Sequence, residues 1–316
     1  MKNQTLFKSS ILFFLIFSLG LTSCQNKNDA KSDGNDSSSL IIDDSSFGND
    51  SSEGSSSEQT DLPIGYSLKD STSYKGKNQY IKNFTGSYYS GINKNLEGTE
   101  LQKQLYNLLT STAKHKGYTY NNLLNSTFPY TDAYDYENIG NKSSVTSFYS
   151  GKKASTGSMN REHVWPNSRG GNYIDSDPHM TRPTITTENS KRGNDFFNED
   201  GNFDPAFFSN PKYRGIAARI IFYCAVKGMN YNLRIVDKTN DTWNKNDPNQ
   251  RTMGKLNDLL KWNIQYPVDD SERLRNNYLN EHDNWCRNPF IDDRNYACKI
   301  WGRTNSATMA TCGIKS

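Results

Sequence analysis

Cysteine and histidine are scarce in this chain of 316 residues, which contains five cysteines and four histidines. No two cysteines form a CxxC pair, so a structural zinc site of the usual spacing is excluded. The sequence also lacks the HExxH, GxSxG, Walker and GxGxxG patterns. Their absence excludes the common zinc-protease, serine-hydrolase, nucleoside-triphosphatase and dinucleotide-binding sites.

Long apolar runs are equally rare, and the clearest one, ILFFLIFSLGL, lies near the N-terminus. It follows Lys2 and Lys8 and precedes LTSC, which is the order of a bacterial secretory signal in residues 1–24. The run is too short to span a membrane comfortably. LTSC resembles the lipobox of bacterial lipoproteins, in which Cys24 becomes the lipid-bearing N-terminus; a plain secretory signal is the alternative. We therefore expect a lipid-anchored protein outside the cytoplasm, attached to the cell membrane or partly released from it.

Residues 25–62 contain few apolar side chains and consist mainly of Ser, Asp, Asn and Gly, with nine acidic and two basic residues. Such a segment cannot bury enough apolar surface to fold, so we expect a disordered tether. Because this segment is acidic, the net charge of +3 for the whole chain is lower than the net charge of residues 63–316. These residues are the predicted folded domain, and they are basic. A basic domain favours polyanionic partners such as nucleic acid, although charge alone does not establish one.

Apolar periodicity predicts mostly helices in the folded domain. Leucines three and four residues apart predict a helix from Gly98 to about Lys116, the apolar segment 213–228 predicts a core helix, and 253–267 predicts another that Pro267 closes. Further helices are expected near 119–127, 187–197 and 271–285, and strands are expected at 144–152 and 159–165. The predicted fold class is α+β, a mainly helical domain around a small sheet.

Four cysteines remain after Cys24. Cys224 lies in an apolar segment and is expected to be a buried core thiol. Outside the cytoplasm disulfides are permitted, and the other three cysteines are expected to form one, with Cys298–Cys312 and Cys286–Cys298 as the candidate pairs.

Glu162 and His163 stand side by side in NREHVWPNS. Neighbouring side chains of a regular strand point to opposite faces, so both can serve one site only at a strand end or bend, which Pro166 permits. A histidine suits the activation of water for phosphodiester hydrolysis, and a carboxylate suits Mg²⁺. His115 and His282 are expected to be structural or solvated, which leaves His163 and His179 as candidates.

NREHVWPNS resembles the signature of the endonuclease I family of secreted bacterial nucleases, which belong to the ββα-metal (His-Me finger) class. Further segments match in order: YYSG, TDAYDYEN and SFYSGK upstream, then NSKRGNDFF, YRGIAARIIFY, WNIQYPVDDSERLRNN, CRNPFIDD and IWG. The resemblance covers about residues 85–302. It implies a ββα-metal finger within the helical domain and a nuclease that leaves 5′-phosphate ends.

The resemblance also assigns roles to individual residues. It implies that His163 is the general base and that Glu162 and Asn194 bind the metal, Mg²⁺, with Mn²⁺ and Ca²⁺ as alternatives. An arginine is expected to stabilise the transition state, with Arg169 the first candidate and Arg161 and Arg192 behind it. One departure is His179-Met180, where family members often have His-Asn, so any role of that asparagine is lost or moved. His179 itself is a candidate supporting residue.

The sequence thus predicts an Mg²⁺-dependent endonuclease without sequence preference, acting on DNA or also on RNA through backbone phosphates. No protein partner is inferred. Two other functions are weighed: a noncatalytic surface lipoprotein that binds nucleic acid or another polyanion, and a phosphodiesterase for small substrates.

Overall fold

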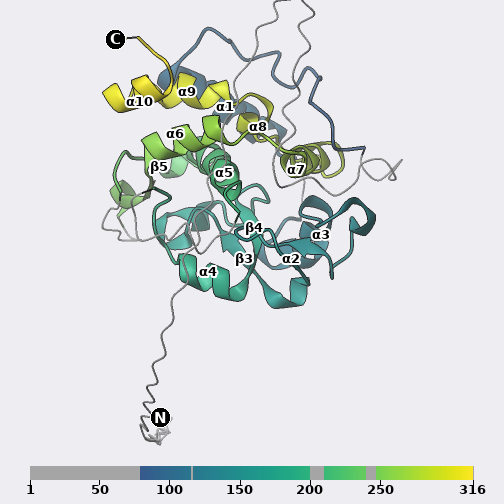
Figure 1. The fold of residues 1–316 in the computed structure, drawn as a ribbon. Coiled ribbons are helices and arrows are strands. Elements are labelled where there is room, and N and C mark those ends of the chain that lie inside the picture. Colours follow the sequence, from purple (N-terminus) through teal and green to yellow (C-terminus); the bar gives the residue numbers. More distant parts are fainter. Residues whose placement is uncertain (1–78, 115–116, 200–209, 240–246, 316) are drawn as a thin grey trace, which may run out of the picture. The chain divides into compact units, whose positions relative to one another are not determined.

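A long apolar helix, α5 (Tyr213–Lys227), lies at the centre of the helical part of the fold (Figure 1). The computed structural model describes residues 79–114, 117–199, 210–239 and 247–315, all within the compact unit Gln59–Ser316. Every residue of α5 from Gly215 to Val226 is buried, as expected for a helix enclosed on all sides. The helices that pack against α5 include α1 (Gly98–Thr112), α6 (Leu256–Gln265) and α8 (Pro289–Asp292).

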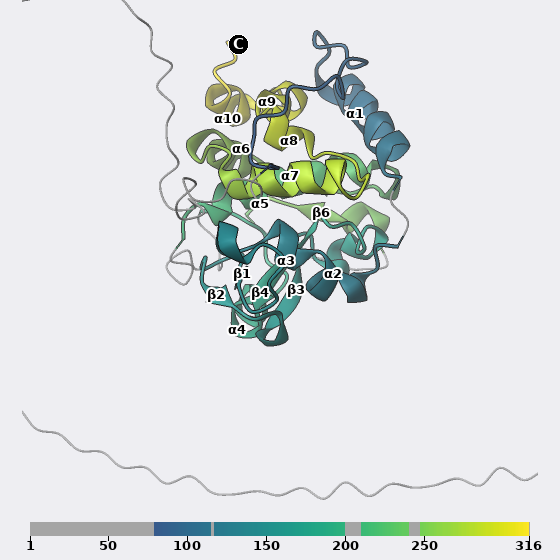
Figure 2. The ribbon, with the colours of Figure 1, turned by 90° about the vertical axis from the view of Figure 1, so that its right-hand side faces the viewer.

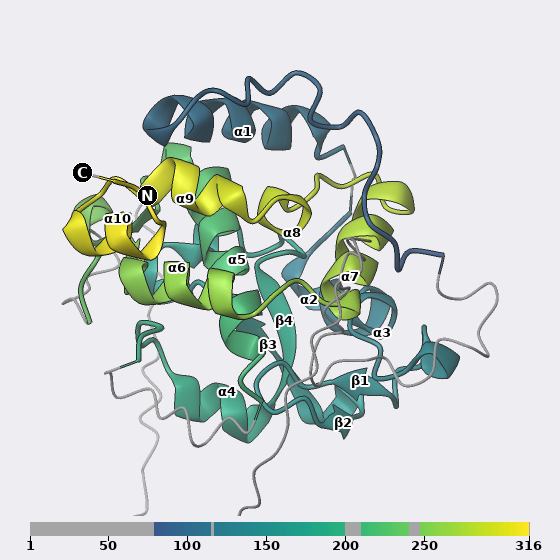
Figure 3. The same ribbon diagram turned by 45° about the horizontal axis from the view of Figure 1, so that its top comes forward.

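Three further helices complete this helical layer: α7 (Asp270–Glu281), α9 (Asn295–Trp301) and α10 (Ser306–Thr311). Figures 1 and 3 show α1 and α9 on one side of α5 and the strands β3 and β4 on the other. The helical layer therefore lies behind β3 and β4, the strand pair that includes the Glu-His motif.

The described residues form three separate two-stranded sheets. β1 (Val145–Thr146) pairs with β2 (Lys153–Ala154), and β5 (Arg234–Ile235) runs parallel to β6 (Thr252–Met253). The longest pair is antiparallel, β3 (Met159–His163) with β4 (Thr181–Ile185), and it places Glu162 opposite Arg182 and His163 opposite Thr181. β4 continues directly into helix α4 (Thr186–Arg192), and these elements lie together in Figure 2.

Buried ion pairs fix β4 to the helices beside it. Arg182 of β4 pairs at 2.8 Å with Asp132, which directly follows α3 (Phe128–Thr131). Arg275 of α7 pairs with the same carboxylate and donates a 2.8 Å hydrogen bond to the Thr181 carbonyl oxygen. Because breaking a buried pair leaves an uncompensated charge, these contacts hold β4 in one position relative to α3 and α7.

The mainly helical α+β class predicted from the sequence is confirmed, although three small sheets replace the expected single one. The predicted core helix, the leucine-rich helix and the helix closed by Pro267 are observed as α5, α1 and α6. The short helix expected near 119–127 is α2 (Tyr120–Ser126), and the strand expected at 159–165 is β3.

Three helices end about four or five residues earlier than predicted, and the first of these is α1, which ends at Thr112 instead of near Lys116. The helix expected at 187–197 is α4, which ends at Arg192 because Gly193 has φ +64° and breaks the helical path. The helix expected at 271–285 ends at Glu281.

Two strand predictions also need correction. The strand expected at 144–152 is reduced to β1, since the chain turns back where the Gly151 N–H bonds to the Ser147 carbonyl oxygen. β4 was not predicted at all, because Pro183 at its centre removes a backbone donor and argues against a strand. The pair tolerates it because the Pro183 carbonyl oxygen accepts a 2.9 Å hydrogen bond from the Phe148 N–H, so the backbone of Pro183 faces away from β3 and the pairing with β3 loses no donor.

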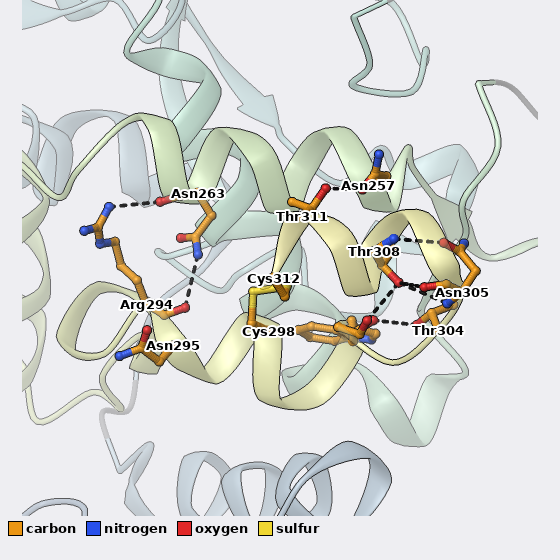
Figure 4. Close-up of a disulfide and its surroundings, with 12 residues drawn as sticks. Asn257, Asn263, Arg294, Asn295, Cys298, Thr304, Asn305, Thr308, Thr311 and Cys312 are labelled. Atoms are coloured by element: carbon orange, nitrogen blue, oxygen red, sulfur yellow. Dashed lines mark hydrogen bonds between the residues drawn. A yellow bond between two sulfur atoms is a disulfide. The ribbon is translucent and has the colours of Figure 1, made fainter. Parts of the chain in front are cut away.

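The structure decides between the two disulfides that the sequence leaves open. Cys298 of α9 is bonded to Cys312, which follows α10, and Figure 4 shows the bond joining the two helices. Cys224 is a buried free thiol, as predicted, and Cys286 is also buried and free.

The predicted signal, the Cys24 lipobox, the tether and His115 lie outside the described residues. Among the helices that the structure does describe, none is both long enough and apolar enough to cross a membrane.

Candidate active site

β3 presents Glu162 and His163 to different neighbours. Glu162 is 2% exposed and lies against Tyr149 and Arg192. His163 is the last residue of β3, is half-buried, and stacks on the ring of Tyr120. The strand therefore ends at the histidine, as required if two adjacent side chains are to reach one site.

The carboxylate of Glu162 is buried, and its neighbours balance its negative charge only partly. The Tyr149 hydroxyl donates a 2.6 Å hydrogen bond to Oε1, and the Arg192 Nε lies 3.5 Å from the same oxygen. Burial raises the pKa of Glu162, and the charge of Arg192 and the hydrogen bond from Tyr149 act against this rise. A buried carboxylate in this state gains from any further positive charge placed beside it.

His163 carries a nitrogen without a partner. Its Nε2 is buried and has no hydrogen-bond partner among the described residues, while the Tyr120 ring lies 4.6 Å away at 21°. Burial, with the nearby charges of Arg161 and Arg192, lowers the pKa of His163 to about 4. The imidazole is therefore neutral at neutral pH, and a neutral imidazole has one nitrogen that accepts a proton.

Tyr120 is held in place by local sequence. Thr119 and Asn122 form a capping box that begins helix α2 at Tyr120. The Tyr120 hydroxyl donates to the Arg161 carbonyl oxygen at 3.2 Å, and the Arg161 guanidinium lies 4.2 Å from the centre of the Tyr120 ring. Arg161 and His163, two residues apart on β3, thus lie against the same ring, and Arg161 is partly exposed.

Arg192 joins α4 to β3. It is 1% exposed and, besides its contact with Glu162, donates to the Val164 carbonyl oxygen at 2.9 Å and to the Gly193 carbonyl oxygen at 3.0 Å. Because one guanidinium makes all three contacts, the Glu162 carboxylate and the start of the segment after α4 lie around the same side chain.

Asn194 follows Gly193 and is exposed. The prediction placed it on a helix, whereas it lies two residues beyond the end of α4. Arg169 donates from Nε to the Asn194 carbonyl oxygen at 2.7 Å and packs 4.4 Å from the Phe196 ring. Arg169 is 2% exposed, so its side chain is held inside the fold by these contacts.

His179 belongs to the core instead of the site. It is 1% exposed, its Nε2 lies 2.9 Å from the Cys286 carbonyl oxygen, and its ring packs 4.8 Å from that of Tyr223. Burial lowers its pKa well below the usual value. The side chain of His179, a possible supporting residue from the sequence, is thus taken up by contacts with Cys286 and Tyr223.

In the part of the chain that the structure describes, no group of three or more His, Cys, Asp or Glu side chains is arranged to hold a metal ion. The Glu162 carboxylate lies beside Arg192, and the Asn194 amide belongs to the residue after Gly193, whose carbonyl oxygen Arg192 also contacts. Such hard oxygen ligands suit Mg²⁺, which keeps several waters and needs few protein ligands, better than they suit zinc.

Two residues that contact the Glu-His pair were missed from the sequence. Tyr149 lies in SFYSGK, one of the segments that resemble the family, so its position carried a signal whose use was not evident. Tyr120 carried no signal, because nothing in its local sequence points to a histidine 43 positions further along the chain.

Comparison with known proteins assigns the chain to a protein family. The sequence profile of a family described as Endonuclease I matches residues 97–204 and 203–295, more than half of the chain. The protein belongs to the endonuclease I family. The members are nucleases, hydrolases that act on phosphodiester bonds, and the predicted family is thereby confirmed.

Two relatives carry the name extracellular ribonuclease. The protein from Bacillus subtilis (strain 168) is 33% identical over 242 residues, which cover 69% of this chain and 79% of that protein. The protein from Bacillus amyloliquefaciens is 39% identical over 165 residues, which cover 46% of this chain and 55% of that protein. The chain thus spans little more than half of the latter relative. No solved structure matches.

Proposed function

We propose that this protein is a divalent-metal-dependent endonuclease that hydrolyses the phosphodiester backbone of RNA and DNA without sequence preference, leaving 5′-phosphate ends. The observation that carries the proposal is the Nε2 atom of a neutral His163, which is buried, has no hydrogen-bond partner among the described residues, and belongs to the residue that follows Glu162 on β3. The name of the two Bacillus relatives supports RNA as a substrate. We further propose that β3, β4 and α4 form a ββα-metal finger, which their order along the chain supports.

Glu162 and Asn194 would hold the metal, with Mg²⁺ the best match to their oxygen atoms. The fit rests on Glu162, whose buried carboxylate is only partly compensated by Arg192 at 3.5 Å. When bound, the ion supplies positive charge to the phosphate and leaving oxygens. Arg192 and Arg169 position the two ligands, because Arg192 contacts Glu162 and Gly193 while Arg169 holds the Asn194 carbonyl oxygen.

His163 takes the proton from the attacking water. Its lowered pKa keeps the ring neutral above about pH 4, so the accepting nitrogen is free at neutral pH. Stacking against Tyr120 limits rotation of the ring and so keeps that nitrogen aimed at the site.

Arg161 is the arginine best placed to stabilise charge on the phosphate. It lies against the same tyrosine as His163 and is partly exposed, whereas Arg169 and Arg192 are almost fully buried. This proposal replaces Arg169, the first candidate from sequence, because a guanidinium can stabilise a transition state only if the substrate can reach it. The experiment that tests the whole proposal is cleavage of circular RNA and DNA by the full chain and by a His163→Ala variant.

Replacing Tyr149 with phenylalanine is expected to weaken metal binding. The variant loses the 2.6 Å hydrogen bond to Glu162, and because that bond lowers the pKa of Glu162, its loss raises the pKa and makes protons stronger competitors of Mg²⁺. Removing a partner of a metal ligand typically costs about 10- to 100-fold in affinity. The measurement is the Mg²⁺ concentration that gives half-maximal cleavage at neutral pH.

Tyr223→Phe is the matched control, since Tyr223 is equally buried and its hydroxyl donates to the Asp177 carboxylate at 2.7 Å. Both variants lose a hydrogen bond to a carboxylate, and each is expected to lose roughly 1.5–3 kcal/mol of unfolding free energy. Only Tyr149→Phe should shift the Mg²⁺ requirement. An equal shift in both variants, or in neither, would contradict the assignment of Glu162.

We also propose that Cys24 carries the lipid that anchors the protein to the outer side of the cell membrane. The two relatives named extracellular ribonucleases support a location outside the cytoplasm, and the LTSC sequence supports the anchor. Cys24→Ser is expected to move the protein from the membrane fraction to the medium. Unchanged partitioning into detergent would refute the anchor.

A further inference from the structure

Two of the most exposed aromatic residues in the described part of the chain stack on each other. Tyr173 and Tyr231 are 41% and 43% exposed, and their rings lie 4.8 Å apart at 14°. A single exposed tyrosine needs no explanation, but two flat rings held in parallel at the surface offer a preformed stacking face.

An arginine holds this pair in place. The Arg251 guanidinium lies 4.3 Å from the centre of the Tyr173 ring, and it donates hydrogen bonds of 2.8 Å to the Tyr173 hydroxyl and 2.9 Å to the Tyr231 carbonyl oxygen. Arg234, exposed on β5, is next to Arg251, since its N–H donates to the Arg251 carbonyl oxygen. We call Tyr173, Tyr231, Arg251 and Arg234 the stacking platform. It combines aromatic faces with cationic groups.

The stacking platform adjoins the loop that follows His163 and links β3 to β4. Gly170 is in a left-handed conformation with φ +94°, and a Cβ there would lie 3.0 Å from the Arg251 side chain, so the backbone approaches that arginine closely. The next residue, Gly171, donates from its N–H to the Pro166 carbonyl oxygen, three residues after His163. Tyr173 is two residues further and at most about 7 Å away along the chain. The platform is therefore within reach of a strand a few nucleotides long whose phosphate lies at His163.

We propose that the stacking platform binds unpaired bases of single-stranded nucleic acid next to the cleaved phosphate, which rests on the proposed nuclease function and names the substrate class. Bases of a single strand expose their faces and stack on aromatic side chains without regard to sequence, whereas bases of a duplex are stacked on one another. Arg251 and Arg234 supply the positive charge that tracks the backbone. The enzyme is thus expected to prefer single-stranded regions.

The test measures binding separately from cleavage, in the full chain carrying His163→Ala. Fluorescence anisotropy gives Kd for three probes of equal length: a single-stranded RNA, the same RNA as a duplex, and an abasic strand that keeps the phosphates. Tyr231→Leu is expected to weaken binding of the single strand by about 5- to 150-fold, the range that stacking of one base provides. Tyr231→Phe keeps the ring and should bind as the parent does.

The other two probes identify what the platform contacts. Binding of the duplex and of the abasic strand should be the same in Tyr231→Leu as in the parent. An equal loss for the abasic strand, or no loss for the intact single strand, overturns the proposal, because the platform then does not bind bases. If the platform binds single strands as expected while the unmutated chain cleaves nothing, the proposed nuclease function fails and the binding site stands.

Discussion

Replacing His163 with alanine is expected to lower kcat for cleavage of RNA and DNA by about 10²- to 10⁴-fold, the contribution usual for a general base. The reason is that the variant loses the unpartnered nitrogen of a neutral imidazole at the end of β3. His163 is half-buried and makes no hydrogen bond through Nε2 among the described residues, so the fold should survive. The measurement is the rate of cleavage of circular substrates, with circular dichroism as the check on folding.

His282→Ala is the matched control. His282 also stacks on a tyrosine, Tyr278, at 4.6 Å, but its side chain is 56% exposed and it pairs with Asp283. It should cleave at the parent rate. A folded His163→Ala variant with full activity would refute the assignment of the general base. A parent protein that binds nucleic acid but cleaves none would favour the noncatalytic polyanion-binding lipoprotein.

Removing the metal or its carboxylate ligand is expected to have an effect of similar size. EDTA should abolish cleavage, and added Mg²⁺ should restore it in the parent protein. Glu162→Gln keeps the shape and an acceptor for Tyr149 but removes the charge, so cleavage should fall by at least about 100-fold, since a metal supplies several kcal/mol to the transition state. Isothermal calorimetry of Mg²⁺ binding checks the loss independently of activity.

Glu188→Gln provides the comparison for Glu162→Gln. Glu188 is also buried, lies on α4, and accepts a 2.6 Å hydrogen bond from the Ser147 hydroxyl, which a glutamine oxygen would preserve. This variant should bind Mg²⁺ and cleave as the parent does. Chelator-resistant cleavage, or equal Mg²⁺ affinity in Glu162→Gln and the parent, would rule out the proposed metal site.

The candidate Glu-His pair could be found from the sequence alone, because Glu162 and His163 are neighbours and the segments around them resemble the endonuclease I family. The arginines were not predictable in the same way. Arg161, Arg169 and Arg192 look alike in sequence, and only the structure shows that Arg161 is partly exposed while the other two are almost fully buried.

The fold shows the same division. α5 was predictable because an apolar segment of its length can only be a buried helix. β4 was not, because its pairing with β3 outweighs the cost of Pro183, and that pairing depends on a strand about 20 residues away.

The sequence by itself determined the helical character of the domain, the Glu-His pair, and the resemblance to the endonuclease I family, because each is carried by residues close together in the chain. Only the tertiary structure decided that Cys298 pairs with Cys312 instead of Cys286, that Tyr149 and Arg192 surround Glu162, and that Tyr173 stacks on Tyr231. The physical reason is that periodicity and helix capping depend on neighbouring residues. Contacts between distant segments depend on how the whole core packs, which no local pattern specifies.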